Sequence, residues 1–407
     1  MSMHEILEQK EQVSTFQDLL YPFKAEGFTQ EYWEKKPLMV QRGDAGYYQS
    51  LFSIDNVDEL LDLTRPQGKS IRIVKNQEPL MASKYENADG SLNLNQIYLA
   101  YADGYTVVVN EIDRFWKPLK ALCQNISAFL NQRAVANMYL TPKNQKALLP
   151  HYDTHDVYVV QVHGTKHWKI YDVEYPIPLV NSFQPVFQRE QLKNVRNVTL
   201  HAGDLMYIPR GVPHEAVTTD ESSLHLTIGV YPTQWADLLV KSIMHLAHSH
   251  PTLRQSLPIG CLQPHNLTAA TAAAMNNHMQ ALLQDVLTHA NAQGALQLLA
   301  EEFRMSQQAR GDGHFAHLDR LDEINVHTTL VKRPNMTCTV QQIGASARII
   351  YPGNVIKGPI HITPALLFIA SSTNEFQVAE IPELADENKV KLAQKLIRGG
   401  LLQVAAV

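Results

Sequence analysis

Several features that would define other classes of protein are missing from this sequence. The 407 residues include only three cysteines, Cys123, Cys261 and Cys338, and no CxxC pair, which argues against a disulfide framework, a thiol redox motif and a cysteine zinc site. No apolar run approaches the roughly 18 residues of a membrane-spanning helix. The opening segment, MSMHEILEQKEQVSTFQDLL, has no apolar signal-peptide core. These absences favour a cytoplasmic protein.

An excess of positive charge is also missing. The chain has 35 Lys and Arg against 40 Asp and Glu, so no overall basic field attracts nucleic acid or an anionic membrane. Hydrophobic residues make up 45%, an ordinary globular composition, and the chain is long enough to bury a large core without a structural metal. The unusual count is 18 histidines, and these direct the search for a site.

Short strand-like segments dominate residues 134–231. Residues 1–60 and 114–132 are helical in pattern, and residues 70–112 are expected to form strands. Gly-containing turns such as HGTK and PRGVP separate many of the segments that follow, and this density of short strands predicts a β-sandwich or β-barrel. The segments are AVANMYL, DVYVVQV, HWKIYDV, VTLHAGDLMYI and SLHLTIGVY.

The pattern changes after Tyr231. Residues 233–250 and 268–309 show helical spacing with apolar faces, and the last ninety residues combine helices with a short hairpin, as a winged helix does. We expect an α+β chain in three parts: a barrel domain with N-terminal helical and strand additions over 1–231, a helical region over 232–315, and a winged-helix-like domain over 316–407.

The segment PHYDTHDVYVVQVHG contains the sharpest candidate site. His151 and Asp153 are two apart at the expected start of a strand, so their side chains are predicted to share a face. GDLMYIPRGVPHEA supplies His214 from a second strand. Two histidines and one carboxylate on one side of a metal form the facial triad of non-haem Fe(II) oxygenases, which leaves positions open for a co-substrate and O2.

An HxD pair alone is common by chance, and only its combination with the second segment and the β-rich interval makes it a strong metal signal. The other histidines are read differently. His155 and His163 are expected to face solvent or line the entrance. His245, His248 and His250 lie near a helix end, where the helix dipole accounts for them.

Three segments together resemble the JmjC-type ribosomal oxygenases. They are NMYLTPKNQKALLPHYDTHDVYVVQVHGTKHWKIY, HAGDLMYIPRGVPHEA and SLHLTIGVY. The segment EYWEKKPLMVQR and the C-terminal layout match as well, so the resemblance covers nearly the whole chain. It implies a cupin, or double-stranded β-helix, barrel that uses Fe(II), 2-oxoglutarate and O2 to hydroxylate proteins.

By this resemblance, His151, Asp153 and His214 hold the iron, and Lys166 binds the distal carboxylate of 2-oxoglutarate. A fixed cation suits a dicarboxylate whose other end chelates iron. Taken alone, KHWKIY also fits a strand edge with a solvated lysine. Tyr139 and Asn137 share a strand face and correspond to family positions at the co-substrate and iron. Tyr139 alone equally fits an ordinary buried aromatic.

One strand near the expected pocket departs from the family pattern. His225, Thr227 and Gly229 share a face, and His225 corresponds to a family histidine near the pocket. Gly229 stands where the family often has serine, so one polar contact is lost. The linker KNQKALLP has less glycine than expected, which would reshape the substrate entrance.

The resemblance implies hydroxylation of an Arg or His side chain in a ribosomal protein by a homodimer, with the helices at 233–309 in the dimer interface. Two alternatives stay open: a JmjC oxygenase acting on another peptide or biosynthetic precursor, and a non-catalytic winged-helix binding protein. Residues 317–407 carry nine Lys and Arg and eight Asp and Glu, far from a DNA-binding footprint, so no specific nucleic acid is expected.

Overall fold

The computed structural model describes residues 13–63, 70–173, 175–180, 182–183, 185–263, 268–307, 311–334 and 336–405. Contacts between residues divide the chain into two compact units, Met1–Pro232 and Thr233–Val407. None of the helices in the described part of the chain is long and apolar enough to span a membrane.

The first unit combines five helices with eleven strands among its described residues. Its helices are α1 (Phe16–Leu20), α2 (Ala25–Glu31), α3 (Asp55–Leu63), α4 (Leu94–Ala102) and α5 (Lys117–Leu130). Its strands are β1 (Leu38–Val40), β2 (Ile71–Lys75), β3 (Glu78–Pro79), β4 (Thr106–Val109), β5 (Arg133–Thr141), β6 (Asp156–His163), β7 (Thr165–Ile170), β8 (Arg196–His201), β9 (Leu205–Ile208), β10 (His214–Thr218) and β11 (Ser223–Tyr231).

These strands form two antiparallel sheets, one of eight strands in the order β1-β9-β6-β11-β5-β4-β2-β3 and one of three in the order β10-β7-β8. The predicted barrel of short strands is therefore present. Residues 94–102 were expected as strand and are helix α4 instead. The Asn93 side chain caps this helix by accepting a hydrogen bond from the Gln96 amide, and Ile97 and Ala100 are buried on one face.

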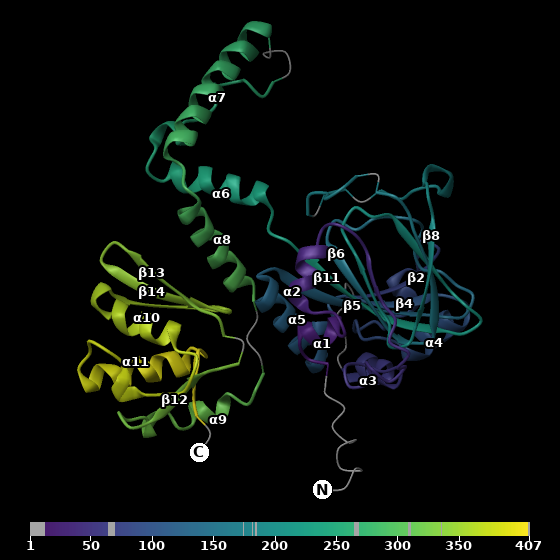
Figure 1. The fold of residues 1–407 in the computed structure, drawn as a ribbon, viewed down its shortest axis with the longest axis horizontal. Coiled ribbons are helices and arrows are strands. Elements are labelled where there is room, and N and C mark those ends of the chain that lie inside the picture. Colours follow the sequence, from purple (N-terminus) through teal and green to yellow (C-terminus); the bar gives the residue numbers. More distant parts are fainter. Residues whose placement is uncertain are drawn as a thin grey trace. The chain divides into compact units, whose positions relative to one another are not determined.

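Side-chain alternation along β6 separates two apolar cores. Tyr158 and Val160 of β6 belong to the large core, which also contains buried residues of α1, α2 and α5. Val157 and Val159 point the other way, into a smaller core shared with strands β7, β8 and β9. Figure 1 shows α1, α2 and α5 grouped beside β5, β6 and β11. The N-terminal helices thus cover one face of the large sheet, and the other face is turned toward the barrel interior.

Helix α5 illustrates why the sequence folds this way locally. Proline stands in its first turn, where the missing amide hydrogen is not needed, and Asn131 ends it in the left-handed conformation with φ of 52°. Leu119, Leu122 and Ile126 are fully buried along one face, as their spacing predicts.

The second unit begins with helices and continues with two small sheets. Its helices are α6 (Trp235–Ala247), α7 (Ala269–His289), α8 (Ala292–Ser306), α9 (Phe315–Leu318), α10 (Thr363–Ser371) and α11 (Asp386–Arg398). Its strands are β12 (Thr329–Lys332), β13 (Thr339–Ile343), β14 (Ser346–Tyr351), β15 (Asn354–Pro359), β16 (Phe376–Gln377) and β17 (Leu402–Val404).

In this unit β13-β14-β15 form one antiparallel sheet and β16-β12-β17 another, around a core supplied by α10 and α11. Helix α6 packs against α8. The division of this unit at 315/316, its winged-helix character and its part in dimerisation stay predictions.

Candidate metal centre and its cavity

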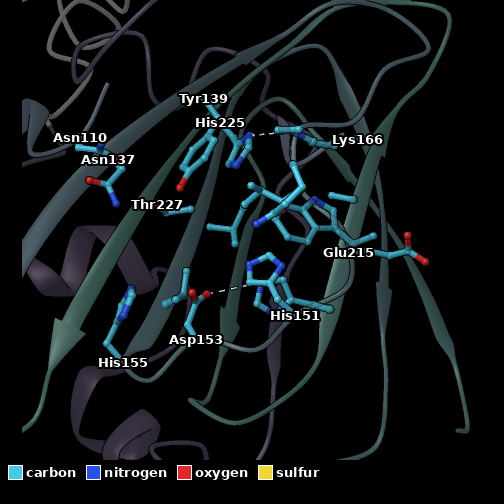
Figure 2. A pocket seen from close by; sticks show the side chains of 18 of the residues that line it. Asn110, Asn137, Tyr139, His151, Asp153, His155, Lys166, Glu215, His225 and Thr227 are labelled. Atoms are coloured by element: carbon cyan, nitrogen blue, oxygen red, sulfur yellow. Dashed lines mark hydrogen bonds and ion pairs between the residues drawn. The ribbon is translucent and has the colours of Figure 1, made fainter. Parts of the chain in front are cut away.

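A cavity of about 290 Å³ lies in the interior of the barrel, lined by strands of both sheets. All seven residues singled out in the sequence line it: Asn137, Tyr139, His151, Asp153, Lys166, His214 and His225. They come from β5, β7, β10, β11 and the segment before β6, so residues up to 88 positions apart (137 to 225) meet at one place (Figure 2).

His151 and Asp153 were expected at the start of a strand, but the structure places them before it. Strand β6 begins only at Asp156, and His151 forms an isolated antiparallel bridge with His214. The two backbones exchange hydrogen bonds, with His151 N donating to His214 O at 3.1 Å and His214 N to His151 O at 2.7 Å. This bridge, rather than the period of a strand, sets the two imidazoles side by side.

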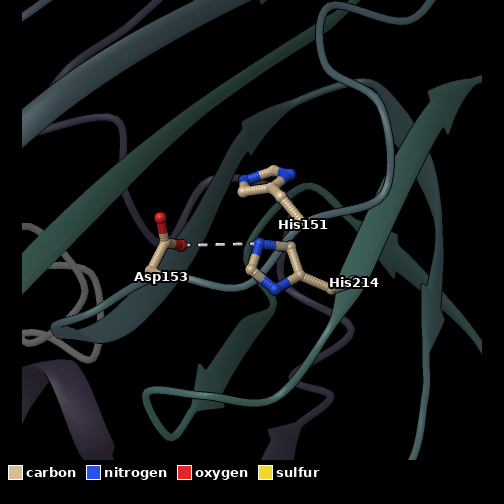
Figure 3. A group of neighbouring side chains, drawn as sticks. All are labelled: His151, Asp153 and His214. Atoms are coloured by element: carbon tan, nitrogen blue, oxygen red, sulfur yellow. Dashed lines mark ion pairs between the residues drawn. The ribbon is translucent and has the colours of Figure 1, made fainter. Parts of the chain in front are cut away.

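The three candidate ligands converge on one point. Their nitrogen and carboxylate oxygen atoms lie within 4.8 Å of one another, and His214 Nε2 is 3.5 Å from Asp153 Oδ2 (Figure 3). The two imidazole centroids are 4.7 Å apart. A divalent ion bound by these atoms would draw them closer together, because metal–nitrogen and metal–oxygen bonds are about 2.0–2.2 Å long.

The hydrogen bonds of both imidazoles fix which nitrogen faces the centre. Nδ1 of His151 donates to Leu149 O at 2.8 Å, and Nδ1 of His214 donates to Val212 O at 3.0 Å. With the proton on Nδ1, the lone pair of each ring is on Nε2, the tautomer that metal-binding histidines use. Two Nε2 atoms and one carboxylate therefore fit a transition-metal ion such as Fe(II).

A buried ionic network that the sequence did not reveal braces the segment after the HxD pair. Asp156, fully buried, accepts hydrogen bonds from Arg210 Nη1 and Tyr207 Oη, each at 2.7 Å. Arg210 also pairs with Glu34 at 2.6 Å. Since Arg210 lies four residues before His214, this network ties the two ligand-bearing segments together. The only sign of it in the sequence was one charged residue of each sign, Asp156 in THDV and Arg210 in IPRG.

The turn between Arg210 and His214 depends on a glycine. Gly211 has φ of +84°, and its amide donates to Asp153 O at 2.9 Å. A Cβ at this position would lie 2.3 Å from Tyr175 O, so a larger residue has neither the conformation nor the space. The turn thus holds the main chain of Asp153 directly.

Lys166 lies deep inside the barrel rather than on a solvated strand edge. Its side chain is 3% exposed on β7, and Nζ donates to Thr141 Oγ1 at 3.2 Å and to His225 Nδ1 at 3.3 Å. Burial lowers the pKa of Lys166 from 10.5 to about 7. Near neutral pH the amine of Lys166 is therefore only partly protonated, and an anion bound beside it would favour the charged form.

Tyr139 and His225 are paired across β5 and β11 and stack with centroids 4.9 Å apart and planes 7° from parallel. Burial, and then the charge of Asp153, raise the pKa of Tyr139 to about 12, so its hydroxyl keeps its proton. Burial and the neighbouring Lys166 lower the pKa of His225 far below its usual value. His225 is thus a neutral acceptor for the lysine.

Other cavity residues were not expected from the sequence. Arg72 of β2 and Asn110, which follows β4, add polar groups to the lining. They join Asn137, which the sequence did single out and whose Oδ1 accepts a hydrogen bond from the Glu111 amide at 2.9 Å. Trp168 lies two residues after Lys166 on the same face of β7, and this spacing was the signal that could have found it.

A second group of potential ligand atoms lies in the other unit. His250, Asp285 and His289 offer atoms within 4.8 Å of one another. Asp285 and His289 form an ion pair of 3.0 Å one helical turn apart on α7, with the imidazole half exposed. Such a pair is an ordinary feature of a helix surface.

Comparison with known proteins bears on this barrel. The family model described as a JmjC domain matches residues 109–238, which include every candidate site residue. A curated relative from Aedes aegypti, named bifunctional lysine-specific demethylase and histidyl-hydroxylase NO66, is 30% identical over 300 residues, covering 70% of this chain and 47% of the relative. Ribosomal oxygenase 2 of Mus musculus is 31% identical over 256 residues, covering 60% and 54%.

The chain thus spans about half the length of the curated relatives it matches. Among solved structures, the Escherichia coli protein ycfD has the same fold, with a TM-score of 0.53 and 16% identity over 94% of this chain and 99% of that one. A structure of that ribosomal oxygenase in complex with cobalt and 2-oxoglutarate has a TM-score of 0.50 and 16% identity, covering 95% and 99%. The predicted fold class, an α+β chain with a JmjC cupin barrel, is confirmed. Residues 109–238 therefore match a JmjC domain, and the chain is similar in sequence to proteins named NO66 and ribosomal oxygenase 2.

Proposed function

We propose that this protein is an Fe(II)- and 2-oxoglutarate-dependent oxygenase that hydroxylates a side-chain carbon of a protein. One observation carries the proposal: three converging metal-binding side chains and a buried lysine line the same cavity. A metal site at one end and a buried lysine at the other suit a keto acid that has a second carboxylate.

In this proposal His151, Asp153 and His214 hold the iron. When bound, iron and 2-oxoglutarate supply the oxidation: O2 converts the keto acid to succinate and CO2, and one oxygen atom enters a substrate C–H bond. The side chains need no acid–base role. Their task is to present two Nε2 atoms and a carboxylate from one side, which leaves the opposite side of the metal free for ligands.

Lys166 would bind the distal carboxylate of the co-substrate. A buried ammonium without an anion is unfavourable, so an incoming carboxylate gains a charge-assisted hydrogen bond and removes that penalty. Thr141 and His225 hold Nζ in place, and the Tyr139 hydroxyl lies in the same lining. Val157, Val159 and Trp168 form an apolar wall that keeps bulk water from the reacting atoms.

The names of the relatives suggest the substrate class. They are a histidyl-hydroxylase and ribosomal oxygenases, so we propose an Arg or His side chain of a ribosomal protein as the target. Incubating ribosomal proteins with the iron-loaded enzyme and 2-oxoglutarate should yield a peptide heavier by one oxygen atom. Peptide mass spectrometry locates the residue, and omission of 2-oxoglutarate should abolish the product.

We also propose a homodimer in the cytoplasm. Four apolar side chains on α6 are more than half exposed in the single chain, which is the usual state of a face that another subunit covers. They are Trp235, Leu239, Val240 and Met244. Light scattering should return twice the 45.9 kDa mass of one chain at micromolar concentration, and a value for one chain contradicts the dimer.

The first experiment is an anaerobic titration of the Fe(II)-loaded protein with 2-oxoglutarate, followed through the visible charge-transfer band of a chelated keto acid. We expect a band in the wild type and a much higher half-saturation concentration in Lys166→Met. Lys169→Met is the matched control, because Lys169 is on the same strand outside this cavity. Absence of a band despite bound iron would refute the proposed class.

A further inference from the structure

One glycine in the barrel lies under an imidazole. Gly229 is on β11, with a backbone conformation that any residue can adopt, but a Cβ there would lie 2.6 Å from Cδ2 and 2.8 Å from Nε2 of His155. Cβ atoms essentially never approach another non-bonded heavy atom this closely, so an added Cβ would force the ring to move. The missing side chain at 229 is therefore space that His155 occupies.

The ring of His155 also contacts Tyr231, which follows Gly229 by two residues on β11. It stacks on Tyr231 with centroids 4.5 Å apart and planes 17° from parallel. The guanidinium of Arg133 lies 5.3 Å from the centroid of the same tyrosine, and Arg133 pairs with Glu111 at 3.2 Å. This stack of Arg133, Tyr231 and His155 fixes the imidazole, so displacement of the ring would break an aromatic contact.

His155 is placed beside the candidate metal centre. It follows Asp153 by two residues and lines the same cavity, together with Thr227. Figure 2 shows His155 beyond Asp153, on the side away from Lys166. If the co-substrate extends from the metal toward Lys166, the remaining part of the cavity, where His155 lies, is the part that a substrate side chain can enter.

We infer that His155, seated on Gly229 and stacked on Tyr231, is the wall of the cavity that selects the substrate side chain. This inference rests on the proposed oxygenase function. The ring presents a flat, rigid surface, and Asn110 and Asn137 add carboxamides to the same lining. The combination fits a planar polar side chain, such as an imidazole, guanidinium or carboxamide, better than a branched aliphatic one.

The contact itself can be tested without any substrate. Gly229→Ala should lower the Tm of the full-length chain by about 3 °C or more, since it forces the ring from its stack. In a His155→Ala background the same substitution should lower the Tm no further, because the ring is gone. Gly27→Ala is the matched control, as a Cβ there meets no atom within 4 Å. Equal losses in both backgrounds overturn the contact.

Selection is tested with the iron-loaded enzyme on a tryptic digest of ribosomal proteins and on synthetic peptides that vary only the candidate target residue. We expect Gly229→Ser and His155→Ala to change the ratio of products from different target residues at least tenfold relative to wild type. A uniform loss over all peptides indicates a structural role only and overturns the inference. A wild-type enzyme that binds 2-oxoglutarate but modifies nothing contradicts the proposed protein hydroxylase, while the Tm comparison still decides the contact.

Discussion

The two ends of the cavity are built in different ways. At the metal end, His151 and Asp153 lie outside any strand and depend on a backbone bridge, a glycine turn and a buried ion pair for their positions. At the other end, Lys166, Tyr139 and His225 project from strands β7, β5 and β11, and the register of β5 with β11 places Tyr139 opposite His225. Irregular segments thus place two of the three candidate metal ligands, and strands carry the groups proposed to bind the co-substrate.

The strongest way to separate the two ends is to remove one group from each. His214→Ala should weaken Fe(II) or Mn(II) binding by more than about 100-fold, because loss of supporting groups around a metal already weakens binding by about 10–100-fold. Lys166→Met should leave metal binding unchanged, since Nζ contacts Thr141 and His225 rather than a ligand. Metal content by mass spectrometry after dialysis measures both. Equal metal loss in the two variants contradicts independent ends.

The bracing of the metal end predicts the next largest effect. Asp156→Ala leaves the buried Arg210 without one of its partners and should lower the free energy of unfolding by about 3 kcal/mol or more. Asp156→Asn, which keeps an acceptor, should lose less. Glu323→Ala is the control, because its pair with Arg320 is exposed and contributes at most about 1 kcal/mol. Chemical denaturation measures all three, and a small loss for Asp156→Ala argues against the brace.

The co-substrate end should show a pH dependence that belongs to one lysine. With a pKa of about 7, Lys166 is charged below that pH and must take up a proton to bind a carboxylate above it. The Kd for 2-oxoglutarate should therefore rise about tenfold per pH unit above pH 7. Lys166→Arg, which stays charged, should show no such slope even if its binding is weaker. The charge-transfer titration at several pH values measures this, and equal slopes assign the effect to another group.

A smaller effect is expected at Tyr139. Tyr139→Phe keeps the stack on His225 but removes the hydroxyl that we expect to donate to the co-substrate. One such hydrogen bond is typically worth about 0.5–1.5 kcal/mol. The half-saturation concentration for 2-oxoglutarate should rise by about two- to tenfold, with metal binding unchanged. Loss of metal in this variant would show that the two ends are coupled.

Sequence reasoning succeeded where a residue's neighbours follow from strand periodicity. The pairs Asn137 with Tyr139 and His225 with Thr227 were expected to share faces, and the register of β5 and β11 places them opposite one another. The barrel itself and helix α5 followed from period and turn residues. Helix α4 did not, because its cap at Asn93 and its two buried residues lie in a short segment with strand-like flanks.

Contacts made only in three dimensions could not be predicted from the sequence. The bridge between His151 and His214 joins segments far apart in the chain, and nothing local announces it. The same holds for Asp156 with Arg210 and for the imidazole of His155 above Gly229. The sequence marks Gly229 as a departure from the family pattern, but only the structure shows that His155 occupies the space of the missing side chain.

The buried ammonium of Lys166 has a consequence for how long the protein persists. A ligand that binds the folded chain and not the unfolded one stabilises it, by about 2.7 kcal/mol at a concentration 100 times its Kd. With no dicarboxylate present, burial disfavours the charged form of Lys166 and lowers its pKa to about 7; a bound carboxylate would stabilise the charged form. The lifetime of this protein against proteolysis would then follow the supply of the keto acid, so that starvation for the co-substrate reduces the amount of enzyme as well as its turnover.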